Sequence, residues 1–184
     1  MNLPNKLTLL RVCMIPFFVV FARMSAFWAQ CVAVGLYALA CVTDALDGHI
    51  ARSRNLITNF GKFMDPIADK LLVMSAMIVL TAQGRMPDWV CVLMLGREFL
   101  VSGFRLVAVE NGVVIAAGPL GKVKTVFQMI STIALMLLVP VEGEALLGAA
   151  GATFARVLMY VALVLTVVSG ADYILRNRDC IRDM

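Results

Sequence analysis

The sequence predicts an all-α protein: an integral membrane bundle of six transmembrane helices with a short N-terminal interfacial segment. Hydrophobic residues make up 61% of the 184 residues and charged residues only 15%, whereas soluble domains carry about 25% charged residues. A chain of this length cannot bury so much apolar surface in one aqueous core. Six apolar runs are each close to the roughly 20 residues that cross a bilayer as a helix.

The apolar runs follow one another along the whole chain. The start of the sequence, Asn2 to Lys6 with Pro4, predicts the interfacial segment. Pro16 lies inside the first run and is expected to kink that helix or to offset its start. No internal repeat or linker separates the runs, so residues 1–184 are expected to form a single domain. The expected helices are Leu9 to Ala29, Cys31 to Ala51, Phe63 to Ala82, Trp89 to Val109, Val123 to Val141 and Ala152 to Leu175.

Basic residues predict how these helices are oriented. Six spans place both termini on one side of the membrane, and lysine and arginine accumulate in short cytoplasmic loops. The more basic side carries Lys6, Arg11, Arg52, Arg54, Lys62, Lys70, Arg105, Lys122, Lys124, Arg176, Arg178 and Arg182. The other side carries Arg23, Arg85 and Arg156, together with Asp88, Glu142 and Glu144. Both termini and the loops of the first set are therefore expected in the cytoplasm.

The cysteines and the net charge argue against several classes of function. The five cysteines are scattered and form no CxxC pair, which indicates free thiols rather than a zinc site or a disulfide framework. The net charge of +4 agrees with loops that face anionic lipid. It does not indicate a nucleic-acid-binding protein.

The connection between the second and third helices holds a cluster of carboxylates. Four of the twelve acidic residues, Asp44, Asp47, Asp65 and Asp69, lie within this window of 26 residues. Asp44 and Asp47 are three residues apart, and Asp65 and Asp69 are four apart, so each pair lies on one face of a helix. A short connection makes the two helices antiparallel neighbours. All four carboxylates are therefore expected to converge at the cytoplasmic membrane boundary.

An oxygen-only cluster of this kind suits hard divalent cations such as Mg²⁺ or Mn²⁺. Two such ions bridged by carboxylates form a clamp for phosphoryl transfer. Gly48 has no Cβ, so a nucleotide could approach the backbone there, and Gly61 could allow a tight turn before the third helix. Arg52 could bind a phosphate through both of its Nη groups, or it could anchor the cytoplasmic side. The alternative for the whole window is a solvated loop with ordinary charge pairs.

The window resembles the signature of the CDP-alcohol phosphotransferases, D-x-x-D-G-x-x-A-R-x8-G-x3-D-x3-D. All eight fixed positions match: Asp44, Asp47, Gly48, Ala51, Arg52, Gly61, Asp65 and Asp69. The resemblance implies a six-helix protein of the bacterial inner or plasma membrane. It also implies that the four aspartates surround two divalent cations and that Asp69 is the general base. Gly48 and Arg52 would help to hold the CDP moiety, and we assign Gly61 to the same CDP-lipid site.

Other segments resemble the family members that join CDP-diacylglycerol to sn-glycerol 3-phosphate, with release of CMP. These segments are residues 3–11, residues 96–99 with Arg105, and residues 121–125 with Gln128. The resemblance favours Arg105, Lys122 and Lys124 as ligands of the acceptor phosphate, although position alone equally allows cytoplasmic anchors. Arg97 and Glu98 lie deep inside a span, where charges usually serve a site or pair with each other, and we favour a polar interior over a purely structural pair.

Three alternatives remain at this point. The same chemistry could use another acceptor, such as phosphatidylglycerol, serine or inositol phosphate. A divalent-cation transporter could line its path with carboxylates, but transporter sites lie near the bilayer midplane within inverted repeats. A membrane scaffold without catalytic activity would leave the aspartate spacing without a reason. A homodimer is compatible with the sequence.

Overall fold

All regular structure in the described residues is helical, as predicted. The computed structural model describes residues 3–53, 59–110, 118–139 and 147–177, with side chains except at residues 3–5, 44–53, 59–63, 65, 66, 69 and 110. The described chain forms α1 (Leu3–Arg23), α2 (Phe27–Ser53), α3 (Asn59–Ala82), α4 (Asp88–Glu110), α5 (Pro119–Leu138) and α6 (Gly148–Arg176).

The prediction for the start of the chain was wrong. Residues from Leu3 onward belong to α1 rather than to a separate interfacial segment, and α1 ends at Arg23 instead of continuing to residue 29. The buried side chain of Gln30 explains the ending, because its amide donates hydrogen bonds to the backbone oxygens of Ala22, at 3.0 Å, and of Met24. Carbonyls at the end of a helix have no partner within the helix, so such side-chain donors stabilise the ending. Hydropathy could not locate this turn, since its residues are themselves mostly apolar.

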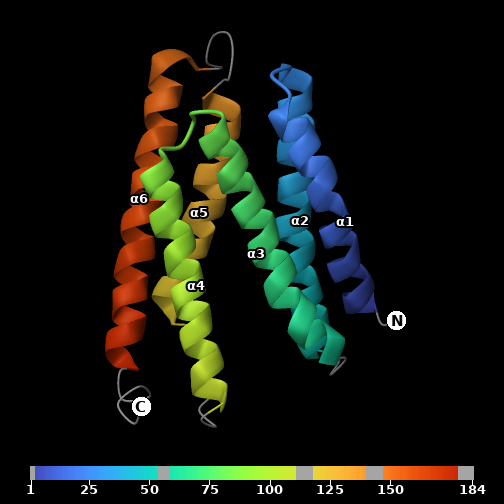
Figure 1. The fold of residues 1–184 in the computed structure, drawn as a ribbon. Coiled ribbons are helices and arrows are strands. Elements are labelled where there is room, and N and C mark those ends of the chain that lie inside the picture. Colours follow the sequence, from blue (N-terminus) through green and yellow to red (C-terminus); the bar gives the residue numbers. More distant parts are fainter. Residues whose placement is uncertain (1–2, 54–58, 111–117, 140–146, 178–184) are drawn as a thin grey trace.

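The helices form two groups of three. Helix α1 packs against α2 and α3, while α6 packs against α5 and α4. Contacts of α5 with α2 and α3, and of α4 with α3, join the groups. Figure 1 shows that the start of α1 and the end of α6 lie at the same end of the bundle. We call this end the terminal end.

The distribution of side chains suits a lipid environment. Large apolar residues are exposed around the outside, for example Phe17, Leu39, Val92, Phe99 and Val164. Among the described side chains, ten polar or charged ones are instead buried: Thr8, Arg11, Gln30, Arg85, Lys124, Gln128, Ser131, Thr132, Thr166 and Ser169. Serine, threonine and glutamine side chains commonly form hydrogen bonds between membrane helices. Within the described residues, α5 and α6 are the two helices long and apolar enough to cross a membrane, and the apolar parts of α2 and α3 are shorter.

The opposite end of the bundle is tied together by a buried arginine. Arg85, in the turn between α3 and α4, donates from Nη1 to Gln30 Oε1 at 2.9 Å and to the Met136 carbonyl at 3.3 Å. Gln83 Nε2 donates to the Ala22 carbonyl at 2.6 Å. Helices α1, α3 and α5 all end here, and the negative ends of their dipoles favour a cation. Burial lowers the pKa of Arg85 to about 10, so the guanidinium stays charged at neutral pH.

Aromatic side chains mark the same end. The exposed Trp89 stacks on Tyr160 with ring centroids 6.2 Å apart, and the exposed Trp28 meets the edge of Phe21 at 6.1 Å. Both tryptophans of the chain are the second residues of their helices. Tryptophan and tyrosine are enriched where a membrane meets water. Both tryptophans lie at the starts of their helices, at the end of the bundle away from the termini.

Candidate active site

The aspartate signature lies in helices at the terminal end. Asp44 and Asp47 are in the last turns of α2, whereas Asp65 and Asp69 are in the first half of α3. Gly48 and Arg52 follow in α2, and Gly61 is the third residue of α3. The end of α2 and the start of α3 lie close together in Figure 1. Because the backbone is helical at both pairs, each pair does share one helix face.

The side chains of the four aspartates and of Arg52 lie outside the described part of the structure, so convergence of the four carboxylates remains a prediction. Among the side chains that the structure does describe, no three or more histidine, cysteine, aspartate or glutamate residues group as a metal site would require. The four cysteines whose side chains are described, Cys13, Cys31, Cys41 and Cys91, are not in disulfide bonds.

A cavity of about 450 Å³ opens between the two groups of helices, and residues from all six helices line it. Apolar side chains from α3 and α4, among them Leu72, Val73 and Leu95, form part of the wall. Polar and charged side chains from α3 to α6 form another part. A cavity with both kinds of wall suits an amphipathic ligand, with a charged headgroup and an apolar tail.

The charged part of the wall centres on Glu98 of α4. Its Oε1 atom accepts a hydrogen bond from Lys124 of α5 and lies 3.4 Å from Nη1 of Arg97. The side chains of Lys124, Arg97 and Glu98 are 4%, 14% and 19% exposed. Charges removed from water to this extent require partners, and one carboxylate here serves two cations.

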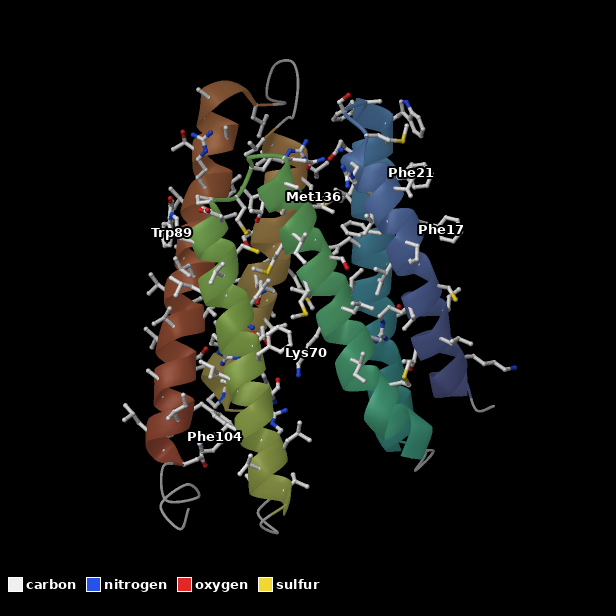
Figure 2. The ribbon with its side chains drawn as sticks, in the orientation of Figure 1. Phe17, Phe21, Lys70, Trp89, Phe104 and Met136 are labelled. Carbon is white, nitrogen blue, oxygen red and sulfur yellow. The ribbon has the colours of Figure 1, made fainter. Side chains whose placement is uncertain are left out.

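A third cation reaches the same wall from α3. The Lys70 ammonium donates a hydrogen bond to Ser102 Oγ, and Ser102 donates to the Glu98 carbonyl at 2.6 Å. Figure 2 places Lys70 between α3 and α4. Lys70 directly follows Asp69 in the chain. The predicted general base therefore belongs to the same helical turn as a residue of this wall. We call Lys70, Arg97, Glu98 and Lys124 the charged cluster.

The three residues predicted to bind the acceptor phosphate all line the cavity, but in different surroundings. Lys124 is buried in the charged cluster, whereas Arg105 and Lys122 are exposed. From the sequence, Lys70 is counted only among the basic residues of the cytoplasmic side, and Arg97 is placed in a polar interior without an assigned ligand. The position of Arg97 deep inside an apolar run was the sequence signal that could have identified it as a ligand-binding residue. Nothing in the sequence singled out Ser169 of α6, which accepts a hydrogen bond from Arg97 Nη2 at 2.9 Å.

Comparison with known proteins agrees with the signature. Residues 1–168 match the model of the CDP-alcohol phosphatidyltransferase family. The chain belongs to this family. The match includes the whole aspartate window and confirms the resemblance seen in the motif.

Relatives within the family are similar over nearly the whole chain. The chain is 40% identical to the CDP-diacylglycerol–glycerol-3-phosphate 3-phosphatidyltransferase of Bacillus subtilis (strain 168), over 98% of this chain and 97% of the relative. It is 41% identical to a probable phosphatidylglycerophosphate synthase of Mycobacterium tuberculosis (strain H37Rv), over 95% of this chain and 81% of the relative. A protein of Rickettsia felis (strain ATCC VR-1525 / URRWXCal2) has the same name as the Bacillus subtilis relative. It is 38% identical to this chain, over 94% of this chain and 93% of the relative.

Proposed function

We propose that this enzyme transfers the phosphatidyl group of CDP-diacylglycerol to sn-glycerol 3-phosphate, giving phosphatidylglycerophosphate and CMP. The observation that carries the proposal is a set of relatives, about 40% identical over nearly the whole chain, whose names state this reaction or its product. The complete aspartate signature and a cavity with charged and apolar walls support it.

The charged cluster is the proposed site for the phosphate of the acceptor. Two of its cations, Arg97 and Lys124, share the single carboxylate of Glu98, which supports binding of an anion at this part of the wall. Arg105 and Lys122 on the exposed part of the wall extend this positive surface. A dianionic phosphate needs fixed cations of this kind, which serine and uncharged alcohols do not.

The CDP-lipid is proposed to bind beside the aspartate signature. Gly48, Arg52 and Gly61 would hold the CDP moiety at the terminal end, and the acyl chains would lie between helices along the apolar wall. In this arrangement the β-phosphorus of the CDP-lipid would lie between the aspartate signature of α2 and α3 on one side and the charged cluster on the other. The acceptor then approaches from the side of α4 and α5.

Members of the family generally use divalent cations. We propose that Asp44, Asp47, Asp65 and Asp69 hold two of them, Mg²⁺ or Mn²⁺. The donor set fits, because these helix positions offer carboxylate oxygens, the ligands that hard cations prefer. Bound cations would polarise the pyrophosphate of the CDP-lipid and neutralise the charge of the departing CMP.

The chain's own residues then carry the proton and orient the acceptor. Asp69 accepts the proton of the acceptor hydroxyl, and the oxygen forms a bond to the β-phosphorus of CDP-diacylglycerol. The bond from that phosphorus to the bridging oxygen breaks, and CMP leaves with this oxygen. Lys124 and Arg97 hold the phosphate of the acceptor so that its hydroxyl points toward Asp69.

Replacing Asp65 by asparagine tests the proposed role of the aspartates in metal binding. The amide keeps the shape of the side chain but removes its charge, so the metal concentration for half-maximal activity should rise about tenfold or more. Titration of CMP release against Mg²⁺ and against Mn²⁺ measures this concentration. Asp88→Asn, at the opposite end of the bundle, is the matched control and should leave the titration unchanged. An unchanged titration for Asp65→Asn would remove this residue from the metal site.

The helices and the family indicate a membrane protein. We propose that all six helices of the single domain cross the membrane, with the terminal end and active site in the cytoplasm of a bacterial cell. The basic residues around the signature and the aromatic residues at the opposite end support this orientation.

Cysteine labelling tests this topology. In a variant without native cysteines, Lys6→Cys and Asn177→Cys should react with an impermeant maleimide only from the cytoplasmic side. Ser25→Cys, in the turn between α1 and α2, should react only from the outer side. Reaction of Lys6→Cys and Ser25→Cys from one side would show that α1 does not cross the membrane.

A panel of acceptors tests the proposed reaction. Purified protein with CDP-diacylglycerol and Mg²⁺ or Mn²⁺ is offered sn-glycerol 3-phosphate, phosphatidylglycerol, serine or inositol phosphate, and CMP release is measured. We expect kcat/KM for sn-glycerol 3-phosphate to exceed that for serine, which has no phosphate for the cluster to bind, by at least about a hundredfold, and also to exceed those for phosphatidylglycerol and inositol phosphate. Preference for another acceptor would refute the assignment.

A further inference from the structure

Two residues of α6, Ser169 and Gly170, contact the side chain of Arg97 on α4. Ser169 is 4% exposed, and its Oγ accepts a hydrogen bond from Arg97 Nη2 at 2.9 Å. Gly170 is also buried, and a Cβ atom placed on it would lie 2.9 Å from Arg97 Cγ and 3.4 Å from Arg97 Nε. Helix α6 therefore fixes this side chain at two points, the aliphatic stem and the guanidinium.

Arg97 has the features of a ligand-binding residue. It lines the cavity, and its Nε is buried without a hydrogen-bond partner in the described structure. Its contact with Glu98, at 3.4 Å, is long for a hydrogen bond. The guanidinium therefore has hydrogen-bonding capacity left for an anion.

We propose that Ser169 and Gly170 are positioning residues of the acceptor site, which seat the Arg97 guanidinium for the acceptor phosphate. This inference rests on the proposed function, because it concerns the same site. Gly170 provides the space that the Arg97 stem occupies, and Ser169 sets the direction of the guanidinium. Helix α6 has none of the aspartate signature, yet it would determine how tightly the acceptor binds.

Single substitutions in α6 test the proposal through the KM values of the two substrates. In Gly170→Ala the new Cβ would lie too close to Arg97 Cγ, so the Arg97 side chain beyond its Cβ has to shift. The displaced guanidinium should raise KM for sn-glycerol 3-phosphate by about tenfold or more. Ser169→Ala removes the hydrogen bond from Arg97, together with the one that Ser169 donates to the Thr166 carbonyl of its own helix, and should raise the same KM about three- to fivefold. KM for CDP-diacylglycerol should change less than about twofold in both, since the lipid is bound elsewhere.

Two matched controls come from the same pair of helices. A Cβ at Gly103 of α4 meets nothing within 4 Å, so Gly103→Ala changes a glycine without touching Arg97. Thr166 of α6 is buried but donates its hydroxyl to its own helix, at the Ala162 carbonyl, 2.6 Å away. Thr166→Val therefore removes a buried hydroxyl without affecting the cavity. Both controls should keep the wild-type KM values.

A double-mutant cycle separates positioning from a general structural role. When Arg97 is already alanine, Gly170 has no side chain to accommodate, so Gly170→Ala should raise the acceptor KM no further. An effect that persists at full size in the Arg97→Ala background would overturn the proposal. So would unchanged acceptor KM values for both Gly170→Ala and Ser169→Ala in protein whose thermal unfolding is like that of the wild type.

The outcomes also distinguish this proposal from the proposed function. If Gly170→Ala does not fold, Ser169→Ala, which only removes a hydroxyl, decides the question alone. A wild-type enzyme that is active with sn-glycerol 3-phosphate but insensitive to both α6 substitutions refutes only the role of α6. A wild-type enzyme that releases no CMP with this acceptor refutes the function, and the positioning role with it.

Discussion

Replacing Asp69 by asparagine is expected to lower kcat by about 10²- to 10⁴-fold, the contribution that a positioned general base usually makes. Asparagine has the size of aspartate but cannot accept the proton of the acceptor hydroxyl. The position supports this role, because Leu72 and Val73, three and four residues after Asp69 in α3, line the cavity. CMP release at saturating concentrations of both substrates and of the divalent cation measures the loss.

A binding measurement with CDP-diacylglycerol distinguishes the loss of the general base from the loss of the substrate site. Asp69→Asn should still bind CDP-diacylglycerol within about threefold of the wild-type affinity, because several groups share that binding. Asp88→Asn, which removes an exposed carboxylate at the start of α4, is the matched control and should keep full activity. If Asp69→Asn kept near-normal kcat at saturating acceptor, another group would have to be the base.

Replacing Lys124 by methionine is expected to raise KM for sn-glycerol 3-phosphate by about 10- to 150-fold, equivalent to about 1.5–3 kcal/mol for one lost charge-assisted contact. Methionine fills similar space without the charge. KM for CDP-diacylglycerol should stay nearly unchanged. Arg105→Ala, on the exposed part of the wall, should change the KM in the same direction but less, because water screens exposed charges.

The substitution of Lys124 has a second effect that needs its own control. It leaves the carboxylate of Glu98 without its closest cation, which should destabilise the fold. The double variant Glu98→Gln/Lys124→Met removes both charges and should recover thermal stability but not the acceptor KM. A double variant that recovered both would make Lys124 a structural partner of Glu98. Lys6→Met, an exposed lysine at the start of α1, controls for loss of charge in general.

Most of the fold could be predicted because lipid imposes a simple rule on sequence. A membrane helix needs a long apolar run, and five of the expected runs have ends within four residues of the observed helices. The boundary between α1 and α2 was missed because the residues around Ser25 are mostly apolar, so hydropathy does not change where the backbone turns. The turn depends on Gln30, a polar side chain whose partners precede it in the chain.

The site was only partly predictable, for a related reason. Local spacing identifies the aspartates, because each pair lies within one helical turn. The charged cluster instead depends on how distant helices pack: Lys124 meets Glu98 across 26 residues, and Arg97 meets Ser169 across 72. Small residues such as Ser169 and Gly170 are ordinary in membrane helices, so the sequence provides no signal for their role.

The transfer of a labelled acceptor into lipid tests the proposed reaction most directly. Purified protein is given CDP-diacylglycerol, a divalent cation and sn-glycerol 3-phosphate labelled with ³²P, and the lipid and aqueous phases are separated. We expect label to enter the lipid phase as phosphatidylglycerophosphate, in equal amounts with the CMP released. CMP release without label in the lipid, or label transfer that does not need CDP-diacylglycerol, would contradict the account.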